Sequence, residues 1–400
     1  MRPGARSSSP EQAASSRGAL GGDVPPAVAL IGLYLLLYVV LDSLRFPIRG
    51  DEAHYWRNTL RFAQTLFPPI ELLRDYGELN TPLPFMIWGA LEYLFGQGIW
   101  LARFTNFLTS FVILLLVIRS RPGTGEWRPY AAAGGVLICP YYLFVSAHAY
   151  TDIIPTCLVL IGVVLHCDRR YVLGAVAFVL AIAGRQYMLA FPAALVAFEL
   201  LDPRGRKSDP VRYLAPAVAC ASIVGWYLFF GGVGPSGEAV RQRIVTIEPE
   251  RLIPRNSVYL MACIGFYYGI PSLVLRRDRL KEEVTGLGAV MLAVLLLALF
   301  LLDPPIQNQN FGIPSMGALD RIVRGATGDL GRAIVFFLLA VTAALRVRES
   351  LLPALLLASN AVLMMKAHIA WDKYALPLIV VLWYLEGSGK WNGRREERHP

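Results

Sequence analysis

Charged residues are scarce in this sequence of 400 residues: they make up 17% of it, whereas hydrophobic residues make up 55%. No polar block of the size of a soluble domain separates the long apolar runs. This composition excludes an ordinary soluble enzyme and indicates a polytopic membrane protein. The net charge of +9 is therefore interpreted as a sign of membrane topology and of contact with anionic membrane lipids, and no nucleic-acid partner is expected.

Cysteine is also rare. The five cysteines all lie in or at the ends of apolar runs, and no two of them form a Cys-x-x-Cys pair; they are Cys139, Cys157, Cys167, Cys220 and Cys263. They are predicted to be small core residues, without a disulfide framework or a zinc site. The sequence also shows no phosphate-binding P-loop and no nucleotide fingerprint. An activated donor would therefore come from the lipid and not from a soluble nucleotide.

Twelve apolar segments are each predicted to cross the roughly 30 Å hydrocarbon core of a bilayer as a helix. A further segment, 82–95, is short, begins with two prolines and contains Glu92, so it is predicted to lie in the interface within a first outer loop at 47–98. The fold class is therefore expected to be an all-α polytopic membrane protein with about 12 transmembrane helices. The predicted spans are 27–46, 99–118, 130–148, 151–167, 171–185, 187–201, 211–230, 257–275, 285–302, 331–345, 351–367 and 374–387.

Both ends of the chain carry basic residues outside the apolar spans. Residues 1–25 are rich in Ser, Ala, Gly and Pro and predict a disordered cytoplasmic tail. The apolar run that follows lacks a convincing cleavage site, so it is predicted to be a retained first helix and not a signal peptide. The transmembrane domain is expected at 26–387, and a basic cytoplasmic tail at 388–400.

The basic connections predict which side of the membrane each loop occupies. If 82–95 does not span, the Arg- and Lys-rich connections and both tails fall on one side, which the positive-inside rule assigns to the cytoplasm. The opposite side then collects nearly every unusual polar residue near the membrane, which predicts a single outward-facing site. Its segments are 47–98, 148–152, 185–186, 231–256, 307–315 and 368–374.

Asp51 and Glu52 follow the first predicted helix and are the leading candidates for catalysis. A carboxylate beside the bilayer is costly and tends to be functional. Asp51 could act as a general base that takes a proton from an acceptor hydroxyl while its oxygen attacks an activated sugar carbon. Because adjacent residues point in different directions, Asp51 is assigned the chemistry and Glu52 a supporting role. The alternative is a pair of solvated charges.

The next outer turn contains His148 and Asp152. Asp152 could be the N-terminal cap of the helix that follows or a second acid of the site, and the sequence leaves both open. His148 could orient a substrate or bond to a backbone carbonyl. No metal-binding cluster is visible and no cofactor is expected, although Asp51 and Asp152 could share a divalent cation.

Arg185 interrupts the apolar run from 171 to 201 at the outer boundary. Arginine binds phosphate oxygens in a bidentate manner and stays charged at all relevant pH values, so Arg185 suits a lipid phosphate. The alternative is an arginine that reaches the lipid headgroups. Lys373 is the second candidate for a donor phosphate.

The remaining outer segments offer hydrogen-bonding and aromatic side chains that suit a sugar. An ordinary exposed turn is the alternative for 307–310, and an interfacial anchor is the alternative for Trp371. The predicted substrate-binding residues are His54, Tyr55, His148, Tyr150, Gln186, Gln307, Asn308, Trp371 and Tyr374.

The stretch Gly50-Asp51-Glu52-Ala53-His54-Tyr55-Trp56 resembles the motif of the protein mannosyltransferase and lipid A aminoarabinose transferase branch of the GT-C membrane glycosyltransferases. Arg103 and 150–152 also match the pattern. The stretch Asn80-Thr81-Pro82-Leu83-Pro84, with Arg185-Gln186 and Lys373-Tyr374, is similar to the dolichyl-phosphate-glucose alpha-1,2-glucosyltransferase. The resemblance covers residues 27–200 and, beyond them, the topology alone; the large C-terminal soluble domain of some members is not found here.

The resemblance implies transfer of a sugar from a polyprenyl-phosphate donor, usually with inversion. It implies Asp51 as the base, Asp152 as its assistant, and Arg185 and Lys373 as contacts of the donor phosphate. The expected protein is thus a multi-pass membrane glycosyltransferase that modifies a glycan, lipid or protein hydroxyl on the extracytoplasmic face. Its compactness favours a bacterial inner membrane. The alternatives are a transporter or flippase of lipid-linked sugars, for which no clear internal repeat is found, and a non-catalytic scaffold subunit.

Overall fold

The computed structural model describes residues 26–40, 45–48, 50–119, 127–201, 209–232, 234–235, 237, 252–275, 287–305, 309–310, 313–314, 316–348, 350–367 and 369–391. The described part is helical, apart from one short antiparallel hairpin of two strands in which Gln309 pairs with Pro314. The predicted tail at 1–25, most of that at 388–400, and Gln307 and Asn308 lie outside the described residues.

Most predicted apolar segments coincide with described helices, whereas the one expected at 331–345 lies within a longer helix that begins at Ala318. In chain order they are α1 (Pro26–Val40), α2 (Asp51–Phe62), α3 (Ile70–Arg74), α4 (Leu83–Phe95), α5 (Ile99–Arg119), α6 (Arg128–Ile138), α7 (Pro140–Ala147), α8 (Ile153–Cys167), α9 (Tyr171–Gly184), η3 (Gln186–Leu189), α10 (Ala190–Leu201), α11 (Val211–Phe230), α13 (Pro254–Ile264), η5 (Gly265–Gly269), α14 (Ile270–Leu275), α16 (Leu287–Leu302), β1 (Gln309–Asn310), β2 (Ile313–Pro314), α17 (Ala318–Val347), α18 (Leu351–Met364), η7 (Asp372–Ala375) and α19 (Leu376–Gly387).

Three described helices are long and apolar enough to cross a membrane: Ile99–Arg119, Val211–Phe230 and Pro254–Leu275. The pair α6 and α7 passes the same test jointly, although it is bent by 70°. The bend follows from Pro140, which has no N–H to continue the helical hydrogen bonds of α6. A helical protein with helices able to cross a membrane is therefore confirmed, and the count of twelve spans stays a prediction.

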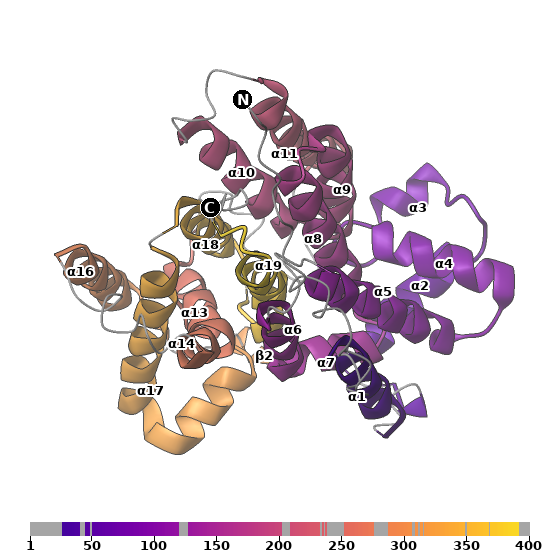
Figure 1. Ribbon diagram of the computed structural model, residues 1–400. Coiled ribbons are helices and arrows are strands. Elements are labelled where there is room, and N and C mark those ends of the chain that lie inside the picture. Colours follow the sequence, from indigo (N-terminus) through magenta and orange to yellow (C-terminus); the bar gives the residue numbers. More distant parts are fainter. Residues whose placement is uncertain are drawn as a thin grey trace, which may run out of the picture.

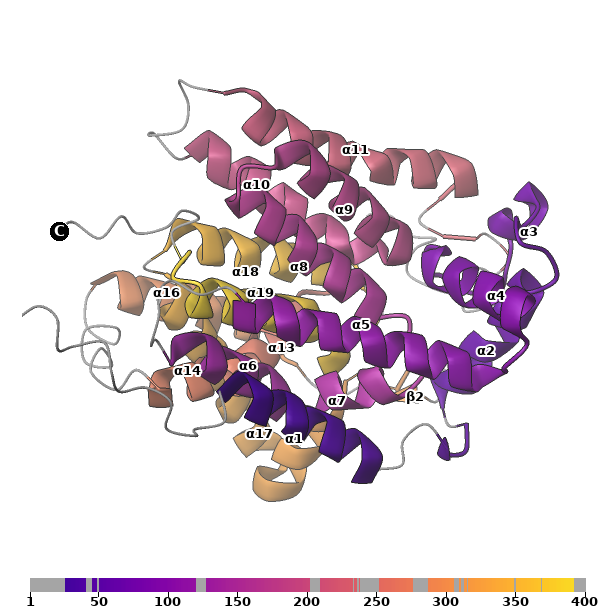
Figure 2. The same ribbon diagram turned by 45° about the vertical axis from the view of Figure 1, so that its right-hand side comes forward.

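The segment predicted to be the first outer loop, 47–98, contains α2, α3 and α4, which Figure 2 shows together at one end of the long helices. Helix α4 begins just after Pro82, as predicted, and ends at Gly96, whose φ of 60° gives the left-handed conformation that glycine adopts at helix ends. It packs closely on α2, since a Cβ on Gly89 would lie 2.5 Å from the Cβ of Phe62.

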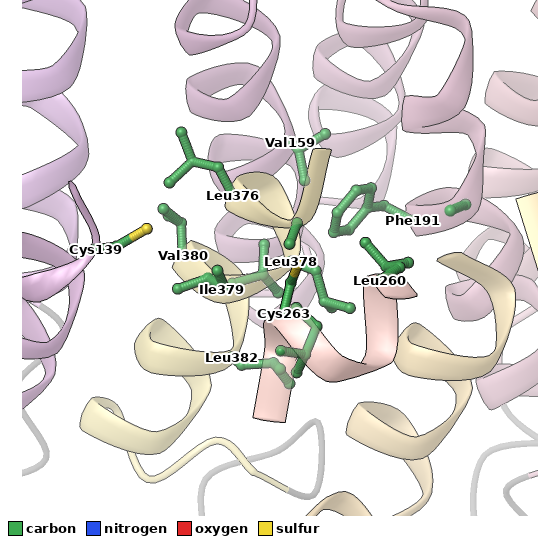
Figure 3. Packing of buried hydrophobic residues seen from close by; sticks show 14 of the residues in the cluster. Cys139, Val159, Phe191, Leu260, Cys263, Leu376, Leu378, Ile379, Val380 and Leu382 are labelled. Carbon is green, nitrogen blue, oxygen red and sulfur yellow. The ribbon is translucent and has the colours of Figure 1, made fainter. Parts of the chain in front are cut away.

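Helix α19 lies at the centre of the protein. Every residue from Leu376 to Gly387 is buried, and α5, α6, α8 and α18 pack around the helix (Figure 1). Figure 3 shows its side chains beside two predicted core cysteines, Cys139 and Cys263, which are indeed buried. Because η7 leads directly into α19, the residues of η7 are held by the most enclosed helix of the chain.

Candidate active site

Helix α2 begins at the predicted catalytic pair. Gly50 precedes it with a φ of 56°, a left-handed conformation that glycine adopts at little cost. The buried residues of α2 recur every three or four positions and form one face; they are Glu52, Tyr55, Asn58, Thr59 and Phe62. Asp51 lies beside this face, and its side chain is 34% exposed.

Glu52 is fully buried and holds together segments that are far apart in the sequence. The Nε of Arg103 donates to its Oε1 at 2.8 Å, and the second guanidinium nitrogen donates to its Oε2 at 2.6 Å. The N–H of Ala149 also donates to Oε1, at 2.7 Å, while Arg103 donates to the carbonyl of Phe46. Glu52 thus fixes the start of α2 against α5 and the turn before α8, which suits the predicted supporting role.

Asp51 forms an ion pair with Lys373 of η7. The Nζ atom of Lys373 lies 3.0 Å from Oδ2 of Asp51, and the Lys373 side chain is only 3% exposed. Three aromatic rings surround the ammonium group: its distance to the ring centres is 4.6 Å for Trp371, 5.0 Å for Tyr150 and 5.8 Å for Tyr374. These contacts are short enough for cation–π attraction.

The charge of Lys373 is stabilised by its surroundings. Burial alone lowers the pKa of the ammonium group, because a low-dielectric environment disfavours charge. The neighbouring side chains of Tyr55, Asp152, Tyr374 and Asp51 outweigh this effect and hold the pKa well above its usual value. We therefore expect Lys373 to be positively charged at physiological pH.

A second ion pair joins Asp152 and Arg185. One guanidinium nitrogen of Arg185 donates to Oδ2 of Asp152 at 3.0 Å, and the other donates to Oδ1 of Asn80 at 2.6 Å. The hydroxyl of Tyr187 donates to Oδ1 of Asp152 at 3.2 Å. Asp152 occupies the N-cap position of α8, but its side chain makes no capping hydrogen bond. The contacts of Asp152 therefore agree with a place beside Arg185 and not with a capping role.

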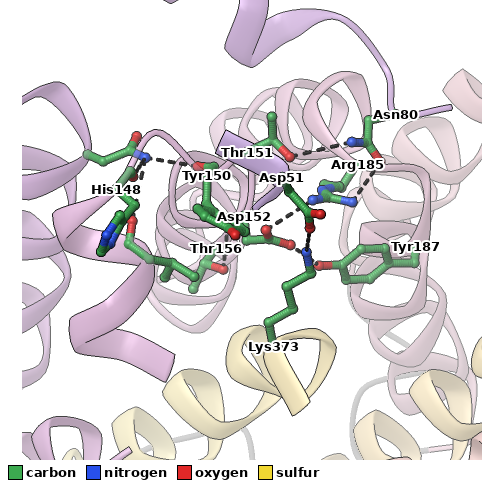
Figure 4. A network of polar contacts seen from close by, with 12 residues as sticks. Asp51, Asn80, His148, Tyr150, Thr151, Asp152, Thr156, Arg185, Tyr187 and Lys373 are labelled. Carbon is green, nitrogen blue, oxygen red and sulfur yellow. Dashed lines mark hydrogen bonds and ion pairs between the residues drawn. The ribbon is translucent and has the colours of Figure 1, made fainter. Parts of the chain in front are cut away.

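Figure 4 shows that the two ion pairs lie together, with the ammonium of Lys373 between the side chains of Asp51, Asp152 and Tyr187. Tyr55 belongs to the same group. Burial raises the pKa of the Tyr55 hydroxyl, and the nearby positive charges of Lys373 and Arg185 partly oppose this effect. Two carboxylates and two cations from four segments of the chain thus meet at one place.

No protein-family model matches the chain, and no curated protein matches it. The chain is similar in structure to ArnT from Cupriavidus metallidurans. The crystal structure of ArnT bound to undecaprenyl phosphate aligns with a TM-score of 0.42 and 15% sequence identity, over 91% of this chain and 77% of that one. The crystal structure of ArnT in the apo state aligns with a TM-score of 0.41 and 17% identity, over 92% and 78%.

Some predicted substrate-binding residues lie outside this group. His148 contacts the carbonyl of Phe144 through Nδ1 at 2.9 Å, which is the backbone contact that the sequence left open. His54 contacts the carbonyl of Gly77 and a carboxylate oxygen of Glu78, each at 3.0 Å. Gln186 follows Arg185 directly and donates to the carbonyl of residue 79 at 2.5 Å. These side chains shape the loops around the ion pairs.

Other predicted residues lie beside Lys373. Tyr150 and Trp371 present their rings to its ammonium group, and Tyr374 also packs edge-on against Tyr187 at 5.5 Å between ring centres. Trp371 is half-buried, and its role in binding a substrate stays a prediction.

The contacts of Asp51 and Asp152 do not favour a divalent cation between them. Asp51 and Asp152 each face a cationic side chain, with which a metal ion would compete. No group of three or more His, Cys, Asp or Glu side chains that could hold a metal occurs in the described part of the chain. A cation shared by Asp51 and Asp152 therefore stays a prediction.

Sequence reasoning did not single out three residues of this site. Asn80 and Tyr187 hold Arg185 and Asp152, and Asp372 is buried next to Lys373. Asn80 could have been found because it begins the stretch Asn80-Thr81-Pro82-Leu83-Pro84, and Tyr187 because it lies two residues after Arg185 in the sequence. Asp372 lay in a segment where Trp371 and Lys373 offered more obvious roles.

Proposed function

We propose that the protein is a membrane glycosyltransferase that takes a sugar from a polyprenyl-phosphate donor. The acceptor is a hydroxyl of a glycan, lipid or protein on the extracytoplasmic face. The observation that supports this most is the partly exposed carboxylate of Asp51 beside the buried ammonium of Lys373. The proposal includes twelve spans, both termini in the cytoplasm and a bacterial inner membrane.

The two cations suit the donor phosphate. A polyprenyl-phosphate sugar carries one negative charge on its phosphodiester, and a second charge develops when the bond between the sugar carbon and the phosphate oxygen breaks. Positive groups already in place stabilise this developing charge at no cost of reorganisation. Arg185 offers a planar pair of donors and Lys373 a compact charge. Both are almost fully buried, which strengthens their attraction to phosphate.

Asp51 suits the acceptor. The acceptor oxygen forms the new bond to the sugar carbon, its proton passes to the Asp51 carboxylate, and the electron pair of the broken bond leaves with the carrier phosphate. Attack from the side opposite to the phosphate inverts the configuration. The 34% exposure of the Asp51 side chain leaves room for an acceptor, while Glu52 holds the backbone from which Asp51 projects.

The test compares wild type with Asp51→Asn in membranes that contain equal amounts of each protein. Radiolabelled sugars on polyprenyl-phosphate carriers serve as donors, and incorporation into acceptor is measured. We expect wild type to consume one donor and Asp51→Asn to be at least about 100-fold slower, as for the loss of a general base.

Glu71→Gln is the matched control, because Glu71 is an exposed carboxylate of α3 in the same outer loop. It should transfer sugar at the wild-type rate. If wild type and Asp51→Asn behave alike with every donor, Asp51 is not the base, and a transporter or a scaffold becomes the better hypothesis.

A further inference from the structure

Asp372 is a buried carboxylate that the proposed chemistry does not use. It is 1% exposed and accepts three hydrogen bonds from other elements. The hydroxyl of Tyr259 donates to Oδ1 at 2.7 Å, that of Tyr267 donates to Oδ2 at 2.8 Å, and the N–H of Leu319 also donates to Oδ2 at 2.8 Å. Burying a carboxylate costs free energy, and none of these three partners is a cationic side chain that would offset the cost. The position of Asp372 therefore needs an explanation.

The first reason lies in helix α17. The first N–H groups of a helix have no partner within it, and the N-cap of α17 is Gly317, which has no side chain. Asp372 and the hydroxyls of two tyrosines replace the missing cap. Tyr259 accepts from the N–H groups of Gly317 and Asp320, each at 3.2 Å, and Tyr141 accepts from that of residue 318 at 3.3 Å.

The geometry around Gly317 shows how tight this junction is. A Cβ on Gly317 would lie 1.9 Å from Oδ1 of Asp372, so a larger residue would displace the carboxylate. Met316 and Ala370 also pair as a parallel bridge. The segment before η7 is thus joined to the start of α17 by backbone and by side chain, over a separation of 53 residues between Asp372 and Leu319.

The second reason is the neighbour of Asp372. Residues of a 3₁₀ helix are spaced about 120° apart, so Asp372 and Lys373 of η7 project in different directions. Asp372 reaches α13 and α17, while Lys373 reaches Asp51 of α2. Anchoring the carboxylate therefore fixes the short piece of backbone from which the ammonium projects.

We propose that Asp372 is a positioning residue of the donor site, which sets the place of Lys373 by fastening η7 to Tyr259, Tyr267 and the start of α17. This inference rests on the proposed function, because it assigns Asp372 an effect on the carrier phosphate that acts through Lys373.

The experiment measures the binding of undecaprenyl phosphate to the full-length protein in lipid nanodiscs, by titration of the tryptophan fluorescence to which Trp371 contributes. Asp372→Asn keeps the size of the side chain but replaces one acceptor oxygen by a donor. We expect about 10-fold weaker binding, the effect of misplacing one charge-assisted hydrogen bond. In a Lys373→Met background the same substitution should change binding by less than about 2-fold, because its effect passes through Lys373.

Two further variants separate positioning from folding. Asp320→Asn removes the buried ion pair with Arg332 within α17. It should lower the unfolding temperature and leave the binding of undecaprenyl phosphate within about 2-fold of wild type. Tyr259→Phe removes one anchor of Asp372 and keeps the carboxylate, so it should weaken binding in the same Lys373-dependent way even where Asp372→Asn does not fold.

The results that overturn the inference are also specific. Wild-type binding by Asp372→Asn and Tyr259→Phe, or an equal loss with and without Lys373, would show that Asp372 serves only the fold. If wild type does not bind undecaprenyl phosphate or transfer any sugar, the proposed function fails and the inference falls with it. If wild type does transfer sugar, and Asp372→Asn and Tyr259→Phe bind the carrier as wild type does, only the positioning role is removed and the proposed function stands.

Discussion

Asp51 and Lys373 face each other, although one is assigned to the acceptor and the other to the donor phosphate. In the proposed reaction, their contact at 3.0 Å makes the carboxylate and the carrier phosphate compete for one ammonium group. We expect this competition to have a consequence during the proposed transfer. An Asp51 that has taken up the acceptor proton is neutral and releases Lys373 to the phosphate, and an Asp51 that has lost the proton attracts Lys373 again.

This competition predicts that Asp51→Asn binds undecaprenyl phosphate more tightly than wild type does, although it transfers sugar much more slowly. The amide has the size of the carboxylate but no charge, so Lys373 is free to bind the phosphate. We expect about a 10-fold gain in affinity, as for one charge-assisted hydrogen bond. Titration in nanodiscs measures it. The gain should disappear in a Lys373→Met background, and weaker binding by Asp51→Asn would contradict the competition.

The raised pKa of Lys373 predicts how carrier binding depends on pH. The usual pKa of the group is 10.5, and its value in the folded protein is higher. Its charge, and the stability that the charge contributes, is therefore complete below pH 10.5 and is lost only as the pH rises through the higher value. Carrier affinity measured from pH 7 to pH 10 should show no loss from Lys373. A fall within this range that is absent in Lys373→Met would refute the assignment.

At the scale of elements, the close contact at the start of α17 predicts that a larger residue there destabilises the protein. Gly317→Ala places a methyl group against the Asp372 carboxylate, where a Cβ would lie at 1.9 Å. We expect a loss of about 1–3 kcal/mol in the free energy of unfolding, as for overpacking in a tight interior, together with weaker binding of undecaprenyl phosphate. Thermal unfolding and titration measure the two effects.

Gly325→Ala in the same helix is the matched control. No atom of the described residues lies within 4 Å of a Cβ placed there, and alanine favours a helix over glycine by about 1 kcal/mol. This variant should therefore be as stable as wild type or more so. Equal losses in both variants would show that any added methyl group disturbs α17.

The elements themselves could largely be predicted from the sequence. A helix in a membrane needs a continuous apolar run, so the segments at 99–118 and 211–230 were found to within a residue of α5 and α11. The start of α4 was given by Pro82 and Pro84. The break between α6 and α7 was missed because the apolar character continues through Pro140, and only the backbone there changes direction.

At the scale of the whole molecule, the sequence singled out Asp51, Asp152, Arg185 and Lys373 but did not predict which of them pair. Asp51 and Lys373 are 322 positions apart, and no local pattern determines contacts over such distances. Asp152 was open between a cap and a site residue because both roles fit the start of α8; its side chain makes no capping hydrogen bond and contacts Arg185 instead, and its role in a site stays a prediction. Asp372 was missed because its partners lie in α13 and α17, far from its own motif.

The burial of α19 has a consequence for how the protein is made. Asp51 enters the membrane region early in synthesis, whereas Lys373 follows 322 residues later, just ahead of a helix that is enclosed on every side. That helix is synthesised after α5, α6, α8 and α18, the helices that pack around it. A chain still on the ribosome therefore has Asp51 and the pair of Asp152 and Arg185, but Asp51 gains its own cationic partner only when Lys373 has been made.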